Sequence, residues 1–451
     1  FDFTGIGGIA SLFDLRQLEV IRGAQTSAYG VNASSGIIKL STNEADGEEA
    51  SKAKVSIGTH NQRSFGYATG GILGDKASSK TSYRLSISQN KTDGFIKNTF
   101  LNRKDTNQSE ETFSLLKLKH NPSNNSTVQT SFVYTDAKAG YDQWSLNNTY
   151  LKTQSDDPGE DNQRSKGISV RMNSKNFDNF SITLVSTILH TDSIYSYDSD
   201  WGNYQVDENW NLTGTSGYDG FLSIDRNRKA VSQEIRMDSS EDQSVNTLFS
   251  KWTAGIYFSK LSEESDINYL DNFDDDGRAD VFSDYNAQSF SLFSKAEKNL
   301  NHNSKLSYGI RYEYHDVDFM SLTLNNADYS YYDEDSDTWI STPTLDSGSE
   351  VSEKDNLLGA SINYQNKFTD DYTLFLSYNH GYKAAGVNST SFRPVDSSFP
   401  LTFDTEKINT YEIGLAYLNP EKTYQAKLNL FYLERKNAQL RDAGGSKGFF
   451  T

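Results

Sequence analysis

An acidic stretch near the middle of the chain has side chains that suit a metal ion. Oxygen ligands alternate along "NFDDDGRAD", at Asn272, Asp274, Asp276 and Asp280. With Gly277 in the sixth position, this spacing resembles the start of a calcium loop. The twelfth position is Ser283 rather than a bidentate glutamate, so a solvated acidic loop is the favoured alternative. We expect no required cofactor, with Ca²⁺ in this loop kept as a hypothesis; the loop would be extracellular if the chain forms a membrane barrel.

Aromatic side chains stand among polar residues in several long loops and form the candidate ligand-binding set. Its members are Tyr141, Trp144, Trp201, Tyr204, Trp210, Tyr331 and Trp339. Aromatic rings on loops above a rigid scaffold can stack on the ring of a bound ligand, such as a sugar. Packing of the loops on themselves, or a place at the membrane edge, explains any single member equally well.

Catalytic constellations are absent from the sequence. The chain has 6 scattered histidines and no H-E-x-x-H, G-x-S-x-G or P-loop motif. We therefore expect no catalytic residues and no enzyme.

Composition narrows the class of protein. Only 35% of the 451 residues are hydrophobic, yet 27 Tyr and 26 Phe make disorder a poor fit. The absence of cysteine excludes disulfides and thiolate metal sites. A formal net charge of −18 argues against nucleic acid as a partner. No apolar window is long enough for a transmembrane helix.

Hydrophobicity alternates with a period of two in many segments. In "SYGIRYEYH", Tyr308, Ile310 and Tyr312 share one face, while Arg311 and Glu313 share the other. The same alternation occurs in "LLGASINYQ" and "TYEIGLAYL". It predicts β-strands with one apolar face, which a soluble sandwich would also have.

The connections between these segments favour a barrel. About fifteen strands are expected, and short turns alternate with long connections over 91–110, 137–161, 193–229, 263–286, 318–351 and 386–405. Only the first connection, near Asn61, departs from this rule, because it is short on the long side. Tight turns at one end and elaborate loops at the other are typical of outer-membrane barrels. The fold class is therefore predicted to be all-β, a transmembrane antiparallel β-barrel.

The segment before the first strand resembles a known family. "LEVIRGAQTSAYGVNASSGIIKLST" is similar to the end of the plug domain of TonB-dependent receptors, with Ala24 and Ser35 departing from the usual proline and glycine. "DDYTLFLSYNHGYKAAGVN", "FDTEKINTYEIGLAYLN" and "LNLFYLERKNAQLR" resemble later barrel signatures. The resemblance extends from one end of the chain to the other.

This resemblance implies a 22-stranded barrel around an internal plug. We expect residues 1–49 to be the C-terminal part of the plug domain and residues 50–451 an incomplete barrel. The chain would be a fragment that lacks most of the plug, the N-terminal TonB box and about seven strands, and we expect that it would not close by itself.

The resemblance also assigns roles to individual residues. Arg22 matches the plug arginine that pairs with barrel glutamates, and Glu412 matches one of those glutamates. Alternation independently places Glu412 on the polar face, and arginine suits a carboxylate partner. The alternative is that Arg22 caps a local turn of the plug and that Glu412 is one of many solvated acidic residues in the lumen. Gly23, Gly30 and Gly36 would allow positive φ in the plug turns.

The implied function is active uptake across the outer membrane of a Gram-negative bacterium. The ligand would be an iron-siderophore or similar metal chelate, cobalamin or a carbohydrate. The expected partners are TonB with its inner-membrane complex, through a segment that this chain lacks, and outer-membrane lipid. A passive porin or channel is the alternative, and a surface adhesin with repeats is a third, although no repeat period is found.

Overall fold

The computed structural model describes most of the chain. The described residues are 11–23, 27, 30, 33, 36–76, 78–146, 151–209, 211–240, 248–271, 277–325, 330–333, 338–341, 344–388 and 401–440. Within them, the side chains of 22, 270–271, 277–279, 325, 330–333, 338–341 and 344–347 are outside the description.

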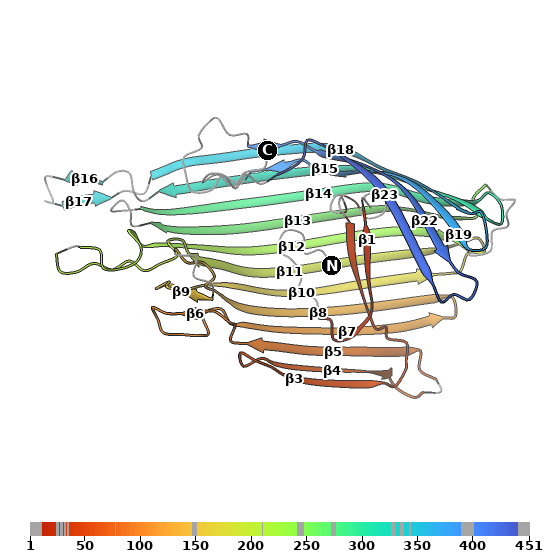
Figure 1. The fold of residues 1–451 in the computed structure, drawn as a ribbon, viewed down its shortest axis with the longest axis horizontal. Helices are drawn as coiled ribbons and strands as arrows, with labels where there is room; N and C mark the ends of the chain where they lie inside the picture. Colours follow the sequence, from red (N-terminus) through yellow and green to blue (C-terminus); the bar gives the residue numbers. More distant parts are fainter. Residues whose placement is uncertain are drawn as a thin grey trace.

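One large antiparallel sheet dominates the molecule (Figure 1). Its 15 strands pair in chain order, each with the next: β3 (Ser51–Ile57), β4 (Arg63–Ile72), β5 (Thr81–Thr92), β7 (Ser109–Ser123), β8 (Ser126–Tyr141), β10 (Gly159–Ser174), β11 (Phe180–Asp198), β12 (Gly220–Ser239), β13 (Lys251–Asp271), β14 (Gly277–Asn299), β15 (Ser304–Asn325), β18 (Thr344–Lys367), β19 (Tyr372–Lys383), β22 (Glu406–Leu418) and β23 (Gln425–Lys436). The predicted all-β barrel wall and its strand number are confirmed.

Smaller strand pairs form separate two-stranded sheets. β1 (Leu15–Arg22) and β2 (Gly36–Thr42) form a separate antiparallel hairpin, and β6 (Lys97–Asn98) pairs in parallel with β9 (Lys152–Thr153). The remaining pairs are β16 (Ser330–Asp333) with β17 (Thr338–Ser341), and β20 (Gly386–Val387) with β21 (Thr402–Phe403). Among the described residues, no helix is long and apolar enough to cross a membrane.

The two faces of the sheet have the polarity opposite to that of a soluble protein. Ile310, Leu358 and Ile413 are each about half exposed. Arg311 and Glu313, one residue out of phase with Ile310, are almost completely buried. Exposed apolar side chains and buried charges are stable together only when the outer face meets lipid and the inner face lines a polar lumen.

The short turns lie where the sequence predicts them. They connect β4 to β5, β7 to β8, β10 to β11, β12 to β13, β14 to β15, β18 to β19 and β22 to β23. All of them therefore lie at one end of the antiparallel wall, and the loops lie at the other end (Figure 1, left).

Two of the predicted long connections are wrong. Residues 263–286 are mostly strand, because β13 continues to Asp271 and β14 begins at Gly277. Residues 318–351 likewise contain the ends of β15 and β18. A 21-residue strand is about 70 Å long at about 3.3 Å per residue, far more than a bilayer needs. The change to polar residues shows where these strands leave the bilayer. It does not mark their ends, because the backbone pairing continues into water.

The β1–β2 hairpin crosses the long strands of the wall in Figure 1. Val20 pairs with Ile38, and Glu19 pairs with Lys39, whose Nζ lies 3.4 Å from the carboxylate. Contacts described below connect the segment around this hairpin to β5 and β7 at one side and to β15 and β18 at the other. The hairpin therefore occupies the lumen.

Candidate functional site

The loop before β2 contacts the wall at Gly30. A Cβ placed on Gly30 would lie 2.9 Å from Arg311 Nη2 and 3.2 Å from Glu313 Oε2. The backbone of Gly30 therefore rests directly on two buried charged side chains of β15. Nearby, Ser27 Oγ donates a hydrogen bond to Ser361 Oγ of β18 over 3.1 Å.

Arg311 is held by groups from three strands. Its Nε donates to Glu313 Oε2 over 2.9 Å, and its Nη2 donates to Ser291 Oγ over 2.7 Å. The guanidinium also lies over the rings of Tyr257 and Phe293, 5.5 and 5.6 Å from their centroids. These contacts hold the guanidinium in place beneath the backbone of Gly30.

Glu313 receives a second donor from across the sheet, since Tyr382 Oη donates to its Oε2 over 2.8 Å. Sequence reasoning did not select Arg311, Glu313 or Tyr382 as site residues. One feature of the sequence could have identified the pair: an arginine and a glutamate stand two residues apart on the polar face of a strand. A plug inside the lumen would bury both side chains.

A second contact region lies toward the short turns. Asp14, just before β1, accepts hydrogen bonds from Arg84 Nη2 over 2.6 Å and Arg84 Nε over 2.9 Å. Asn43 Nδ2 also donates to Asp14 over 2.8 Å. Burial raises the pKa of Asp14, but the hydrogen bonds from Arg84 and Asn43 and the positive charge of Arg84 outweigh this and hold the pKa below its usual value. Lys117 adds an ion pair to Glu44 over 3.2 Å.

The predicted pair of Arg22 and Glu412 stays a prediction. Arg22 ends β1 opposite Gly36, and its side chain is outside the described part of the structure. Glu412 is half-buried on the same face of β22 as the buried Glu406. Among described residues, Glu412 has no ion-pair partner, whereas Glu406 binds Arg435 through two hydrogen bonds.

The three glycines predicted for the plug turns have positive φ: +80° at Gly23, +84° at Gly30 and +151° at Gly36. Gly23 has open space around its Cβ position. Gly30 needs glycine for two reasons, its φ and its contact with the wall.

The loop end brings three of the predicted aromatic residues together. Trp144 and Trp201 stack with ring centroids 5.8 Å apart, and Trp144 Nε1 donates to Tyr141 Oη over 3.4 Å. Tyr141 also meets Tyr195 and Tyr197 edge-on, at 4.9 and 6.4 Å. We call Tyr141, Trp144, Tyr195, Tyr197 and Trp201 the aromatic cluster.

The other aromatic candidates are placed as follows. Tyr204 follows Trp201 in the same loop, and its backbone N–H donates to Asp156 Oδ2 over 3.2 Å. Tyr331 and Trp339 lie on the paired strands β16 and β17, with side chains outside the description. Trp210 lies outside the described residues. Tyr195 and Tyr197 were missed, although they fall in the connection predicted over 193–229; in the structure they stand on β11, which continues to Asp198.

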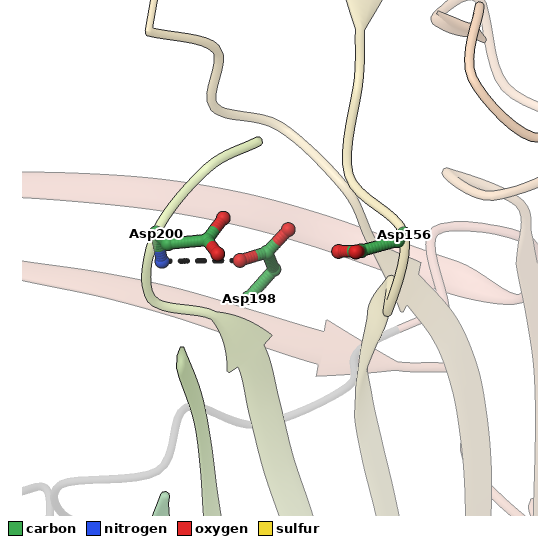
Figure 2. A group of neighbouring side chains, drawn as sticks. All are labelled: Asp156, Asp198 and Asp200. Atoms are coloured by element: carbon green, nitrogen blue, oxygen red, sulfur yellow. Dashed lines mark hydrogen bonds between the residues drawn. The ribbon is translucent and has the colours of Figure 1, made fainter. Parts of the chain in front are cut away.

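Three carboxyl groups meet beside the aromatic cluster (Figure 2). Asp156, Asp198 and Asp200 each offer an oxygen, and these oxygens lie within 4.8 Å of one another. Burial, with the Asp200 carboxylate nearby, raises the pKa of Asp198 to about 8, and burial also raises the pKa of Asp156. Sequence analysis missed this cluster, because Asp156 is far in sequence from "DSD" at 198–200.

The acidic stretch singled out in the sequence is different from this cluster. Asn272, Asp274 and Asp276 lie outside the described residues. Asp280 belongs to β14, where it pairs with Asn268 of β13 and Leu324 of β15. The expectation that Asp280 lies in a loop is wrong, because strand pairing extends through it.

Comparison with known proteins gives a consistent result. The family model described as "TonB dependent receptor-like, beta-barrel" matches residues 51–451. The ferric yersiniabactin uptake receptor FyuA from Yersinia pestis has a TM-score of 0.76 at 16% identity, over 95% of this chain and 61% of that one. The siderophore receptor PiuA from Acinetobacter baumannii has a TM-score of 0.68 at 12% identity, over 93% and 62%.

A third solved structure is the ferric-catecholate import receptor Fiu from E. coli K12 in its closed form. Its TM-score is 0.62 at 14% identity, over 97% of this chain and 65% of that one. The chain thus spans less than two thirds of each of these three receptors. At these identities the likeness concerns the fold.

Proposed function

Because this chain belongs to the TonB-dependent receptor family, we propose that the protein containing it takes up a scarce ligand actively across the outer membrane. Members of this family are transport receptors of the outer membrane of Gram-negative bacteria, not enzymes. The exposed apolar face accordingly meets lipid, and the polar face lines the lumen.

One observation carries the proposal: the segment around the β1–β2 hairpin, which we infer to be part of a plug, contacts two separate parts of the wall. Asp14 binds Arg84 of β5, and Gly30 rests on Arg311 of β15. A passive porin or channel, the alternative, needs a water-filled path and no such attachment. Such an attachment is expected where an energised partner pulls on the plug and breaks its contacts with the wall. TonB and its inner-membrane complex are the proposed partner, acting through a segment outside this chain.

The proposed ligand is a metal chelate of the iron-siderophore class. The aromatic cluster supports this class, because flat rings at the loop end can stack on aromatic or conjugated chelating groups. The names of the three similar receptors refer to ferric yersiniabactin, a siderophore and ferric catecholate. Cobalamin and oligosaccharides are the other classes to be tested.

The first test measures uptake by cells that express the complete receptor. Iron chelates, cobalamin and oligosaccharides are supplied in turn, with and without a proton uncoupler. We expect uptake of one metal chelate, abolished by the uncoupler. Uptake that is indifferent to the uncoupler would favour the passive channel.

A reversible lock tests whether the plug must move. Ser27 and Ser361 hydroxyls are 3.1 Å apart, and this chain has no cysteine that would compete for a disulfide. The double variant Ser27→Cys/Ser361→Cys should lose uptake when oxidised and regain it on reduction, while Ser361→Cys alone should respond to neither treatment. Full uptake by the oxidised double variant would contradict a moving plug at this seat.

A further inference from the structure

The three carboxyl groups join two loops at the open end of the barrel. Asp156 lies between β9 and β10, Asp198 ends β11, and Asp200 begins the loop to β12. The two loops are connected by their backbones, since the Asp156 N–H donates to the Gly202 carbonyl over 3.0 Å. In Figure 2 the three carboxyl groups point toward one another.

Each of these side chains uses one oxygen to shape the loops. Asp198 Oδ1 accepts the backbone N–H groups of Asp200 and Trp201, over 3.0 and 3.1 Å. Asp200 Oδ1 accepts the N–H of Gly202 over 2.7 Å. Asp156 Oδ2 accepts the N–H of Tyr204.

The second oxygens of two of these residues have no partner. Asp198 Oδ2 and Asp200 Oδ2 are buried and receive no hydrogen bond from any described residue. The residues themselves are 6% and 2% exposed. None of the three carboxylates forms an ion pair with a described lysine, arginine or histidine. Buried acidic oxygens without donors or cations are costly unless something binds them.

We propose that Asp156, Asp198 and Asp200 bind one Ca²⁺ ion, which ties the loop before β10 to the loop after β11. The donor set contains only hard carboxylate oxygens, which suit Ca²⁺ and not softer transition metals. These oxygens lie within 4.8 Å of one another, so all three can reach one Ca²⁺ ion at about 2.4 Å. Asp156 is only half-buried, so water can reach the ion from this side and complete its coordination shell.

The ion would also fix part of the aromatic cluster. Trp201 follows Asp200 directly, its N–H is held by Asp198, and its ring stacks on Trp144 of the other loop. Without a cation, negative charge on these carboxyl groups disfavours the contact between the two loops. With Ca²⁺, they are pulled together and Trp201 is held against Trp144.

The test uses the complete receptor in detergent after removal of divalent ions, without any transport ligand. Tb³⁺ is the probe, because nearby tryptophans sensitise its luminescence, and Ca²⁺ and Mg²⁺ are then added as competitors. We expect saturable Tb³⁺ luminescence that Ca²⁺ reverses at a concentration below that needed with Mg²⁺. Asp200→Asn should raise the Ca²⁺ concentration for half-reversal by about tenfold or more, because a charged ligand is lost.

Asp207→Asn is the matched control, since Asp207 lies in the same loop and its carboxylate accepts hydrogen bonds from its neighbours Asn209 and Asn211. This variant should leave the Ca²⁺ response within about twofold of the wild type. A second readout needs no substitution: Ca²⁺ should slow tryptic cleavage after Lys152 of the wild-type protein. Absence of saturable binding, unchanged affinity in Asp200→Asn, or cleavage that ignores Ca²⁺ would each overturn the site. Uptake plays no part in these measurements, so they are independent of the proposed transport.

Discussion

Arg311 Nε lies 2.9 Å from Glu313 Oε2, and both side chains project from the same face of β15 beneath the plug. They are only 4% and 1% exposed. Breaking such a pair from one side leaves the other charge buried and unpaired, which is expensive.

Arg311→Leu should therefore lower the free energy of unfolding of the receptor by about 3–5 kcal/mol, because Glu313 loses its cation. Denaturant unfolding in lipid vesicles measures this change. The double variant Arg311→Leu/Glu313→Leu should recover most of the loss, since neither charge then remains.

The control for this prediction is Arg103→Leu. Arg103 Nε and Asp105 Oδ1 are also 2.9 Å apart and two residues apart in sequence, but both are about half exposed. Removing this arginine should change the stability by no more than about 1 kcal/mol. Equal costs at the two sites would contradict the role of burial.

Gly30→Ala should destabilise the plug more than Gly23→Ala does. Both residues have φ near +80°, so alanine costs about 1–2 kcal/mol of backbone strain at either position. Only at Gly30 does the new Cβ meet Arg311, whose guanidinium is held by Ser291 and Glu313 and cannot shift freely.

Urea unfolding of the plug, followed with a fluorophore on the plug of the complete receptor, measures both variants. The difference between them isolates the contact with the wall. If the two substitutions cost the same, Gly30 does not press against Arg311.

The Asp14–Arg84 pair should make plug attachment sensitive to acid. The pKa of Asp14 in the folded protein lies below its unfolded value of about 3.9, so the carboxylate stabilises the folded state fully above that pH. This contribution is lost as the pH falls through the lowered folded pKa. Asp14→Asn should cost about 2 kcal/mol near neutral pH, and the difference from wild type should shrink below about pH 4.

Plug unfolding in urea at a series of pH values checks this prediction. Asp46→Asn is the control, because Asp46 is exposed and contacts the backbone N–H of Glu48. Its difference from wild type should stay small at every pH. A difference for Asp14→Asn that stays constant down to pH 2 would count against the ion pair.

Trp144→Ala and Trp201→Ala should each weaken binding of the transported ligand if the aromatic cluster holds it. Because their rings stack at 5.8 Å, the two changes should not be additive, with a coupling of about 0.5–1.5 kcal/mol. The concentration dependence of uptake gives the apparent affinities. Phe177→Ala removes a stacked ring at the short-turn end of the barrel and should leave the affinity unchanged.

The sequence by itself determined the wall of this protein. A period of two assigns Ile310 to the outer face and Arg311 and Glu313 to the inner face, because successive side chains on a strand point to opposite sides. Short turns are also local features, and all seven were predicted. The plug segment was recognisable because its motif is contiguous in the chain.

The tertiary structure alone decided which distant residues meet. Gly30 reaches Arg311, and Asp156 reaches Asp198 and Asp200, only after the plug enters the lumen and two loops fold against each other. No local sequence pattern predicts these contacts, because they depend on the curvature of the wall and on how the loops pack. The length of β13 could not be predicted from the sequence either. Where this strand continues into water it keeps its backbone pairing, but it loses the apolar alternation by which a strand is predicted.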